Sequence, residues 1–349
     1  MTKVKFEDVA TRVNTREDRL NTSLLYYVGG EHIESNEMLV QGCGLIKGST
    51  IGPMFYCGFK KGDILLVSRN PHLRKASMVE FDGICSEKTF VLGTKDSKVL
   101  LQEFLALVMQ RDDFWNYCEE HKSGGVNYFL NWSTLAKYEF YLPSIQEQKE
   151  IADKVWSAYR LKESYKKLLV ATDEMVKSQF IEMFGGLCQG TPWSDVVTIT
   201  NGKAYPEEYQ EEGAYPICGS GGIMCYGEKK LCNGNTTILG RKGNINNPIF
   251  MESGYWIVDT AFSIDVDKAK LHPKFFYYWC CQYDFTKLNK QGVLPSLTRK
   301  DLEKVKMAIP QMRDQLKFVS IAEQADKSKF ELKQCIENID KVIKSLING

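Results

Sequence analysis

Apolar residues change their spacing along the chain, and two long stretches show the period of a helix. From residue 143 to residue 184 they recur in steps near three and four, which is typical of one face of an α-helix. Pro143 suits the first turn, Ser144 suits the entry, and Gly185-Gly186 ends the stretch. About 40 residues at 1.5 Å each would span roughly 60 Å, so this helix needs a partner helix to bury its face. The predicted apolar stripe is Ile151, Val155, Ala158, Leu161, Tyr165, Leu168 and Met175.

The second helical stretch covers residues 310–347 and is the obvious partner for the first. Its last part carries a heptad-like series in which Ile336 and Ile343 widen the apolar stripe. We therefore expect the two long helices to pair antiparallel. The members of the heptad series are Leu332, Cys335, Ile339, Val342 and Leu346.

The remaining segments have the pattern of mixed α/β domains. Short apolar runs such as Ile64–Val67 and Thr89–Leu92 alternate with Gly and Asp turns, which predicts strands. A helix is expected from Leu100 to Cys118, with Leu101, Phe104, Leu105, Val108 and Met109 on one face. The predicted domains are residues 1–142, 143–185 (a central long helix), 186–309 and 310–349 (a C-terminal long helix).

The chain contains this plan twice. Leu142-Pro143 and Ile309-Pro310 begin matching stretches, and the offset between the two prolines is 167 residues. That offset holds without a gap from Gly125/Gly292 to Ser178/Ser345, whereas the strand-like runs align at an offset of 172. A repeat this long exceeds a solenoid unit. The sequence thus predicts an α/β (α+β) fold: two globular domains separated by two long antiparallel coiled-coil helices, with pseudo-twofold symmetry and a doubled function.

Composition narrows the class of protein without deciding its function. The 349 residues carry 45 Lys and Arg against 44 Asp and Glu, a net charge of +1, so the chain lacks the basic excess common in nucleic-acid binders. Local basic patches could still serve that purpose. The start of the sequence is charged, no apolar run approaches the ~18 residues of a membrane span, and the 11 cysteines are scattered. We expect a cytoplasmic protein with reduced thiols.

Polar loops follow several predicted strands. Cys218–Ile223 is a glycine-rich turn, and Ile238–Asn244 is a strand that ends in two cations and a turn. Such loops suit contacts to phosphates and to base edges, although ordinary hairpin turns would look the same. In the first domain a basic stretch runs from Lys60 to Lys75, and it could equally be a solvated surface loop.

Several enzyme motifs are incomplete. Asn70–Leu73 and Asn247–Phe250 lack the second proline of the methyltransferase motif Asn-Pro-Pro-aromatic, and no glycine loop for a methyl donor accompanies them. The sequence contains no P-loop, and Gly219-Ser220-Gly221 lacks the spacing of a dinucleotide fingerprint. The seven-residue spacing of Cys218, Cys225 and Cys232 is wider than zinc ligands usually show, and no histidine lies nearby.

Taken together, the motifs resemble the DNA-specificity subunits of Type I restriction–modification systems over essentially the whole chain. The resemblance rests on the two helix starts, on Tyr27–Ile33, on Tyr215–Ile223 with Gly240–Gly243, and on Gly292–Thr298. In the first copy Asn127-Tyr128-Phe129 replaces the Leu-Pro-Ser of the second. The resemblance implies two target-recognition domains that each read half of a split DNA sequence, with the helices as a ruler between them.

The resemblance also implies partners and the absence of catalysis. Two methyltransferase subunits and restriction–translocation subunits would dock on this scaffold, with S-adenosylmethionine and ATP bound by those partners and no cofactor bound by this chain. A protein-binding adaptor with paired coiled-coil helices, or a fragment of a DNA methyltransferase or nuclease, are the alternatives. The candidate DNA-binding residues are Lys61, Arg69, Asn70, Arg74 and Lys75 in the first domain and Lys203, Ser220, Arg241, Lys242 and Asn244 in the second. The candidate partner-binding residues are Pro143, Gln148, Ile151, Pro310 and Gln315.

Overall fold

The computed structural model describes residues 2–187, 190–288 and 296–349, and the chain divides into two compact units. Unit 1 is Met1–Lys166 with Lys333–Gly349, and unit 2 is Lys167–Leu332. Each unit thus holds one globular part and a portion of both long helices, whereas the sequence predicted boundaries near residues 142, 185 and 309. The predicted motif residues Gly292–Pro295 lie outside the described residues.

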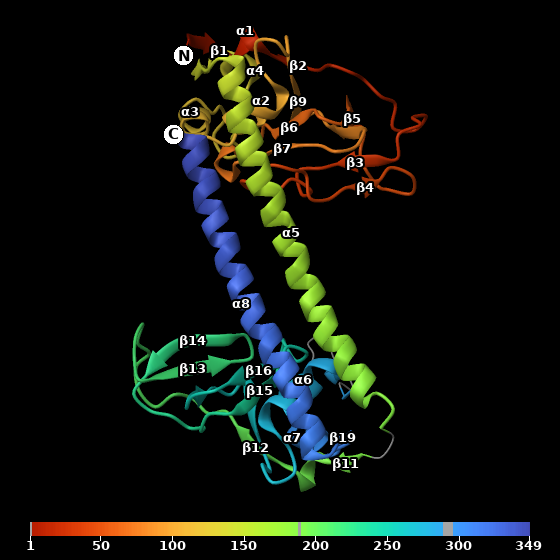
Figure 1. Ribbon diagram of the computed structural model, residues 1–349, viewed down its shortest axis with the longest axis vertical. Coiled ribbons are helices and arrows are strands. Elements are labelled where there is room, and N and C mark those ends of the chain that lie inside the picture. The colour runs from red at the N-terminus through yellow and green to blue at the C-terminus, as the bar shows by residue number, and fades with distance from the viewer. Residues whose placement is uncertain (1, 188–189, 289–295) are drawn as a thin grey trace. The chain divides into compact units, whose positions relative to one another are not determined.

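Unit 1 builds its globular part from two sheets and short helices (Figure 1). One sheet has the strand order β2-β9-β6-β7 and the other β4-β3-β8-β5, in which β3 and β8 run parallel; β1 pairs with β10. The strands are β1 (Thr2–Lys5), β2 (Ala10–Arg12), β3 (Tyr26–Val28), β4 (Gly44–Leu45), β5 (Phe55–Phe59), β6 (Ile64–Val67), β7 (Ala76–Met78), β8 (Gly83–Ser86), β9 (Thr89–Thr94) and β10 (Glu139–Leu142). The short helices are α1 (Phe6–Val9), η1 (Pro71–Leu73), α2 (Gln102–Val108), α3 (Asp112–Glu120) and α4 (Trp132–Leu135).

The continuous apolar run of β6 is explained by burial on both faces. Ile64 and Leu66 belong to the core shared with the helices, whereas Leu65 faces a second core between the two sheets. Successive strand residues point to opposite faces, so a central strand covered on both sides must be apolar throughout. Unit 1 is therefore layered as sheet, sheet and helices.

Unit 2 repeats this arrangement. Its sheets have the orders β12-β18-β15-β16 and β14-β13-β17, with β13 and β17 parallel, and β11 pairs with β19. The strands are β11 (Thr191–Pro192), β12 (Val197–Asn201), β13 (Tyr215–Gly219), β14 (Gly222–Gly227), β15 (Thr236–Gly240), β16 (Ile249–Met251), β17 (Trp256–Ile257), β18 (Ala261–Val266) and β19 (Lys306–Met307). The short helices are η2 (Trp193–Asp195), α6 (Pro273–Gln282), η3 (Phe285–Leu288) and α7 (Arg299–Glu303). The duplication seen in the sequence is therefore a duplication of strand order.

The two long helices are α5 (Ile145–Phe184) and α8 (Met312–Asn348). In unit 1 the first part of α5 and the last part of α8 enter one core, which includes Val155 and Ile343. In unit 2 the end of α5 packs on the start of α8, where the Phe180 and Phe318 rings lie 5.1 Å apart. The early part of each helix meets the late part of the other, so the antiparallel pairing and the predicted fold class are confirmed.

The predicted apolar stripes were partly wrong. On α5, Leu161, Leu168 and Met175 are about half exposed, and beside Leu161 the buried position is taken by Lys162. On α8, Cys335, Val342 and Leu346 are exposed. The face that is turned inward instead carries Leu332, Ile336, Ile339, Ile343 and Ile347, a spacing that follows the 3.6-residue turn of a straight helix and not a strict heptad.

The single helix predicted from Leu100 to Cys118 was also wrong. The structure breaks this segment into α2 and α3, with Arg111 in an extended conformation at φ −70° and ψ 145°. The Arg111 guanidinium donates to Asp113 in the first turn of α3, at 2.8 Å. An acidic first turn is a helix-start signal, and here it begins a new helix within an apolar pattern that continues on both sides.

One glutamine on each long helix joins that helix to its globular part in the same way. The Gln148 side chain accepts from the Leu101 N–H at 3.0 Å and donates to the carbonyls of Val99, at 2.9 Å, and Pro143, at 3.0 Å. The Gln315 side chain accepts from the His272 N–H at 2.8 Å and donates to Lys270 and Pro310, both at 2.9 Å. Both glutamines are fully buried. The amide satisfies the N–H that begins the next helix, α2 or α6, and therefore ties the start of that helix to the long helix.

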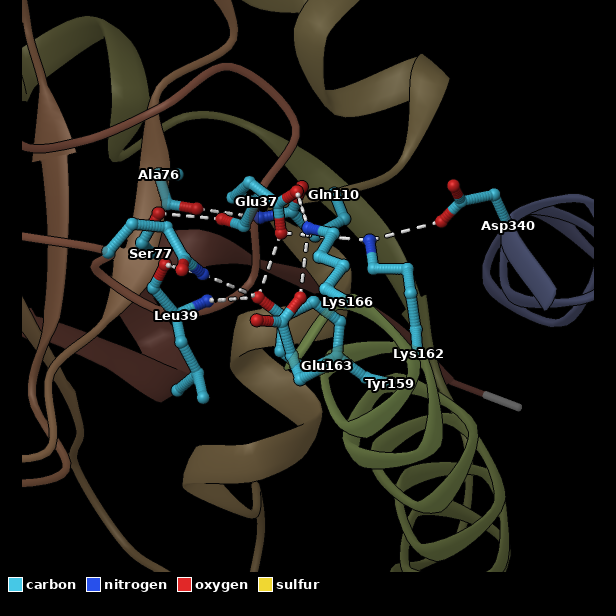
Figure 2. A network of polar contacts seen from close by, with 11 residues as sticks. Glu37, Leu39, Ala76, Ser77, Gln110, Tyr159, Lys162, Glu163, Lys166 and Asp340 are labelled. Atoms are coloured by element: carbon cyan, nitrogen blue, oxygen red, sulfur yellow. Dashed lines mark hydrogen bonds and ion pairs between the residues drawn. The ribbon is translucent and has the colours of Figure 1, made fainter. Parts of the chain in front are cut away.

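Charged pairs link the two long helices within each unit. In unit 1 the Lys162 ammonium lies 3.0 Å from Asp340, and in unit 2 the Lys329 ammonium lies 2.7 Å from Asp173. These four residues are related by the 167-residue offset. Figure 2 shows the unit 1 cluster, in which the partly buried carboxylate of Glu37 also accepts from Lys166 at 2.9 Å and from the Tyr159 hydroxyl at 2.8 Å.

The pKa of Glu37 depends on two opposing effects in this cluster, burial and the neighbouring lysines and tyrosine. Burial alone would raise the pKa, but the hydrogen bond from Lys166, the charge of Lys162 and the hydrogen bond from Tyr159 together lower it below its ordinary value. Glu37 is therefore ionised and paired in the folded protein at neutral pH.

Candidate nucleic-acid interface

Three loops of unit 2 converge at one edge of its sheets. The β13–β14 hairpin turns at Ser220-Gly221, β15 ends at Gly240, and Thr260 precedes β18. The Ser220 N–H donates to the Thr260 hydroxyl at 3.3 Å, and the Arg241 N–H donates to the Thr260 carbonyl at 2.7 Å. A Cβ on Gly240 would lie 2.0 Å from the Asn244 carbonyl oxygen, so the loop after β15 can fold back this tightly because position 240 is glycine.

The side chains predicted to bind DNA in this domain therefore share an edge. Lys203, Lys242 and Asn244 are exposed, and Arg241 is half-buried with its guanidinium 6.0 Å from the Phe262 ring centre. The Lys203 backbone is held in place because its N–H donates to the Ile257 carbonyl at 2.9 Å. Flexible cations on rigid strand ends suit phosphate contacts, and the guanidinium, amide and hydroxyl groups suit contacts to base edges.

These cations have no carboxylate partner among the residues that the structure describes. No ion pair joins Lys203, Arg241 or Lys242 to a carboxylate in the part of the chain that the structure describes. Other surface lysines of unit 2 differ, since Lys229 is 2.7 Å from Glu207. The edge therefore carries positive charge that is free to meet an anionic partner.

In unit 1 the structure brings together part of the predicted set. Arg69 is exposed directly after β6, and Asn70 follows it with a positive φ of 51° and its N–H bonded to the Tyr128 carbonyl at 2.9 Å. The Lys75 ammonium donates to the Gly30 carbonyl at 2.6 Å, which ties the loop after β3 to the same edge. This edge corresponds to the one in unit 2 that carries Ser220 and Arg241.

The other two predicted residues of unit 1 lie elsewhere. Lys61 precedes β6 while Arg69 follows it, so the two lie at opposite ends of the strand. The Arg74 guanidinium is paired with Asp112 at 2.7 Å, at the start of α3. Neither side chain joins the cluster around Arg69, although both had been grouped with it on sequence proximity.

The comparisons with known proteins decide the family. The profile of the Type I restriction modification DNA specificity domain matches residues 25–169 and again residues 192–341. The chain belongs to this family. Two copies of the specificity domain thus coincide with the two halves of the duplication, and the resemblance noted in the sequence is confirmed.

Solved structures agree on the fold. The S subunit of a Type I restriction-modification system from M. genitalium is similar over 99% of this chain and 94% of that chain, with 15% identity and a TM-score of 0.65. A structure described as the basis of complex assembly and conformational transition of the type I R-M system matches 99% of this chain and 96% of that chain, with 16% identity and a TM-score of 0.61. At such identities the likeness shows the fold. The comparison with curated proteins found no match.

Lys88 in the first specificity domain is a further candidate DNA-binding residue that was not predicted from the sequence. The Lys88 carbonyl accepts from the Ser68 N–H at 2.8 Å and from its hydroxyl at 2.7 Å, which parallels the contacts of Thr260 in the second domain. The 172-residue offset places Lys88 on Thr260, so the alignment of the repeats contained the signal. The Lys88 ammonium lies 2.8 Å from Glu87, and it would have to leave that pair to reach a phosphate.

The residues predicted to bind partner subunits are buried or only partly exposed in this specificity protein. Gln148 and Gln315 are fully buried, and Pro143 is buried, so these side chains are not available to another subunit. Ile151 and Pro310 are partly exposed. The identity between the two copies at the glutamines is explained by the hydrogen bonds that each makes between its long helix and its globular part.

None of the helices in the described part of the chain combines the length and the apolar character of a membrane span.

Proposed function

We propose that this chain is the sequence-specificity subunit of a Type I restriction–modification complex and that it reads a split DNA target. The edge of unit 2 around Arg241 would read one half-site, and the edge of unit 1 around Arg69 would read the other. The main support for this proposal is the pattern of the duplication. The buried glutamines and the charged pairs between the helices repeat residue for residue in the two halves. The two edges, in contrast, carry different side chains on equivalent loops. Different side chains on one scaffold suit two different half-sites.

The chemistry would lie on partner subunits. The family match supports a non-catalytic role for this chain. Methyltransferase subunits that bind S-adenosylmethionine and restriction subunits that bind ATP would dock on it. Among the described residues, no cluster of His, Cys, Asp and Glu is arranged to hold a metal ion. In this proposal the complex works on DNA in the cytoplasm.

Mapping methylated adenines tests the split target. The chain is expressed with its methyltransferase subunit in a host without other adenine methylation, and the genome is sequenced for modified bases. We expect a motif of two short specific parts with a fixed gap between them. A single contiguous motif would rule out reading by two domains, and methylation by this chain without the methyltransferase subunit would rule out the non-catalytic role.

A substitution in one unit assigns the half-sites. Arg241→Ala should relax one position of one half-site by about 1–3 kcal/mol and leave the other half-site unchanged, because each domain reads its own bases. Lys268→Ala is the matched control, since Lys268 is also exposed but follows the opposite end of β18. If Arg241→Ala and Lys268→Ala give the same motif and affinity as the unsubstituted chain, Arg241 does not read the target.

A further inference from the structure

Two cysteines of unit 1 face each other across adjacent strands. Cys57 on β5 and Cys85 on β8 are direct partners in the antiparallel register, next to an irregularity between Phe55 and Cys57. Side chains at opposite positions of an antiparallel pair have Cβ atoms about 4.5–5.5 Å apart, close to the geometry of a disulfide. Both thiols are free. The register therefore places two thiols where a bond between them needs little movement of the backbone.

The two thiols differ in access. Cys85 is fully buried in the core between the sheets, whereas Cys57 is half-buried and lies at the margin of that core. A solute can therefore reach Cys57 first, and Cys85 can be reached only through its neighbour. This is the arrangement of an attacking thiol and a resolving thiol.

Charged groups around Cys57 favour its thiolate. A hydrogen bond from Cys85 and the charges of Arg12 and Arg16 lower the pKa of Cys57 to about 7, against the opposing effects of burial and of Glu87. The two guanidiniums are fixed by stacking, Arg12 on Phe90 at 4.9 Å and Arg16 on Tyr56 at 5.2 Å. The pKa of Cys85 is raised well above its ordinary value by its bond to Cys57 and by burial, with Asp63 adding to the rise and Arg12 opposing it.

We propose that Cys57 is an oxidation site for hydrogen peroxide and that Cys85 resolves it, so that the peroxide closes a disulfide between β5 and β8. The Cys57 thiolate attacks one peroxide oxygen; an S–O bond forms, the O–O bond breaks, and the departing hydroxide takes up the proton that Cys57 released on ionising and becomes water. Cys85 then loses its proton and attacks the Cys57 sulfur; the S–S bond forms and the S–O bond breaks. The departing hydroxide takes the Cys85 proton, so two thiols are oxidised and one peroxide yields two waters.

The second domain shows that the fold does not demand this pair. The 172-residue offset places Cys85 on Ile257, an ordinary apolar core residue. The buried Cys218 of unit 2 has its pKa raised to about 11, first by burial and then by its cysteine neighbours. Cys218 in unit 2 is thus a buried thiol whose reactivity can be compared with that of Cys57 in unit 1 of the same chain.

Alkylation rates test the reactivity of Cys57. At pH 7 a thiol of pKa about 7 is half ionised, whereas one at 9.0 is about 1% ionised. Because nucleophilicity falls with pKa, we expect Cys57 to react with iodoacetamide roughly sixfold faster than a thiol of pKa 9.0 would at the same place. The exposed Cys43 is the internal reference, and Cys57 should be labelled faster although it is less exposed. Rates are read by mass spectrometry on the intact full chain under native conditions. Labelling of Cys57 no faster than that of Cys43 would overturn the proposal.

Peroxide treatment tests the pairing. One equivalent of hydrogen peroxide followed by alkylation should link the peptides of Cys57 and Cys85 and leave Cys43 free. In Cys85→Ser the Cys57 sulfenic acid should persist and react with dimedone, whereas Cys57→Ser should leave Cys85 reduced, and Cys43→Ser should still form the link. A link to another cysteine, or oxidation of Cys57 past the sulfenic acid in the unsubstituted chain, would refute Cys85 as the resolving thiol.

Discussion

Truncating the two buried glutamines tests whether each globular part is held to its long helix by one side chain. Gln148→Ala removes a side chain that accepts from Leu101 and donates to Val99 and Pro143. Gln315→Ala removes the equivalent contacts in unit 2. Since the two residues lie in different units, each variant should weaken one unit and leave the other as an internal reference.

The magnitude follows from the groups left without a partner. A neutral hydrogen bond contributes about 0.5–1.5 kcal/mol, and a buried group stranded by truncation costs about 1–3 kcal/mol. Val99 is 46% exposed, so water can reach its surroundings, whereas the bond to Pro143 is buried. We expect Gln148→Ala to cost about 3 kcal/mol. Gln315→Ala should cost somewhat less, because its bond to Pro310 is only partly buried.

Hydrogen exchange reads this change where it occurs. The amide of Leu101 donates to Gln148, so its protection should fall when the acceptor is removed. A loss of about 3 kcal/mol corresponds to roughly a hundredfold faster exchange if the site opens locally, at 1.4 kcal/mol per factor of ten. Peptides covering the start of α2 and the start of α6 are followed by mass spectrometry in the full chain.

The matched control is Gln146→Ala, since Gln146 is exposed on the same turn of α5 and bonds to Glu150 at 3.0 Å. Surface changes of this kind usually alter stability by less than about 0.5 kcal/mol. If Gln148→Ala exchanges like the Gln146→Ala control at the start of α2, the glutamine does not hold the joint. Equal acceleration in both units would show instead that the substitution unfolds the chain globally.

Further predictions concern the helix pair and the DNA edge. In a double-mutant cycle, Lys162→Met and Asp340→Asn should couple by about 1 kcal/mol in urea unfolding, because Lys162 is buried while Asp340 is half exposed. The folded pKa of Glu37 is lowered from 4.5, so its ionisation stabilises unit 1 fully above that pH, and the stability is lost as pH falls through the folded value. Glu37→Gln should remove this acid-dependent part from a fluorescence-monitored titration. Lys242→Ala should lower the salt slope of DNA binding by about 1 without changing the methylated motif.

Each of these has a contradicting result. Additive single substitutions would mean that Lys162 and Asp340 do not interact in solution. An acid transition unchanged in Glu37→Gln would place its cause in other carboxylates. A changed motif in Lys242→Ala would move Lys242 from phosphate contact to base reading.

The sequence predicted the duplication, the long helices and their antiparallel pairing, because these depend on patterns repeated over many residues. It failed where one polar residue overrode the pattern. Lys162 can be buried because it pairs with Glu37 and Asp340. These partners lie far away in the sequence, so a rule based on hydrophobicity does not take them into account. Asp113 likewise marks the start of a new helix within an apolar pattern that continues from α2 into α3.

The candidate site was predictable to the extent that strand ends could be located. Ser220 and Arg241 follow clear strands and meet at Thr260, as expected of loops at one sheet edge. In the first domain proximity in sequence misled, because β6 separates Lys61 from Arg69 and the side chain of Arg74 turns to the start of α3, where one longer helix had been predicted. The glutamines show a contact that the sequence did not indicate: their identity between the copies is accounted for by hydrogen bonds to backbone groups inside each unit.

The reciprocal lysine–aspartate pairs have a consequence for how the two halves can change over time. Lys162 of the first copy meets Asp340 of the second, and Lys329 of the second meets Asp173 of the first. A charge lost from one of these pairs therefore leaves a group of the other copy without its partner on the facing helix. A change in one half is felt by the other half along the helices, whereas the described loops at each edge make no such contact and can diverge independently.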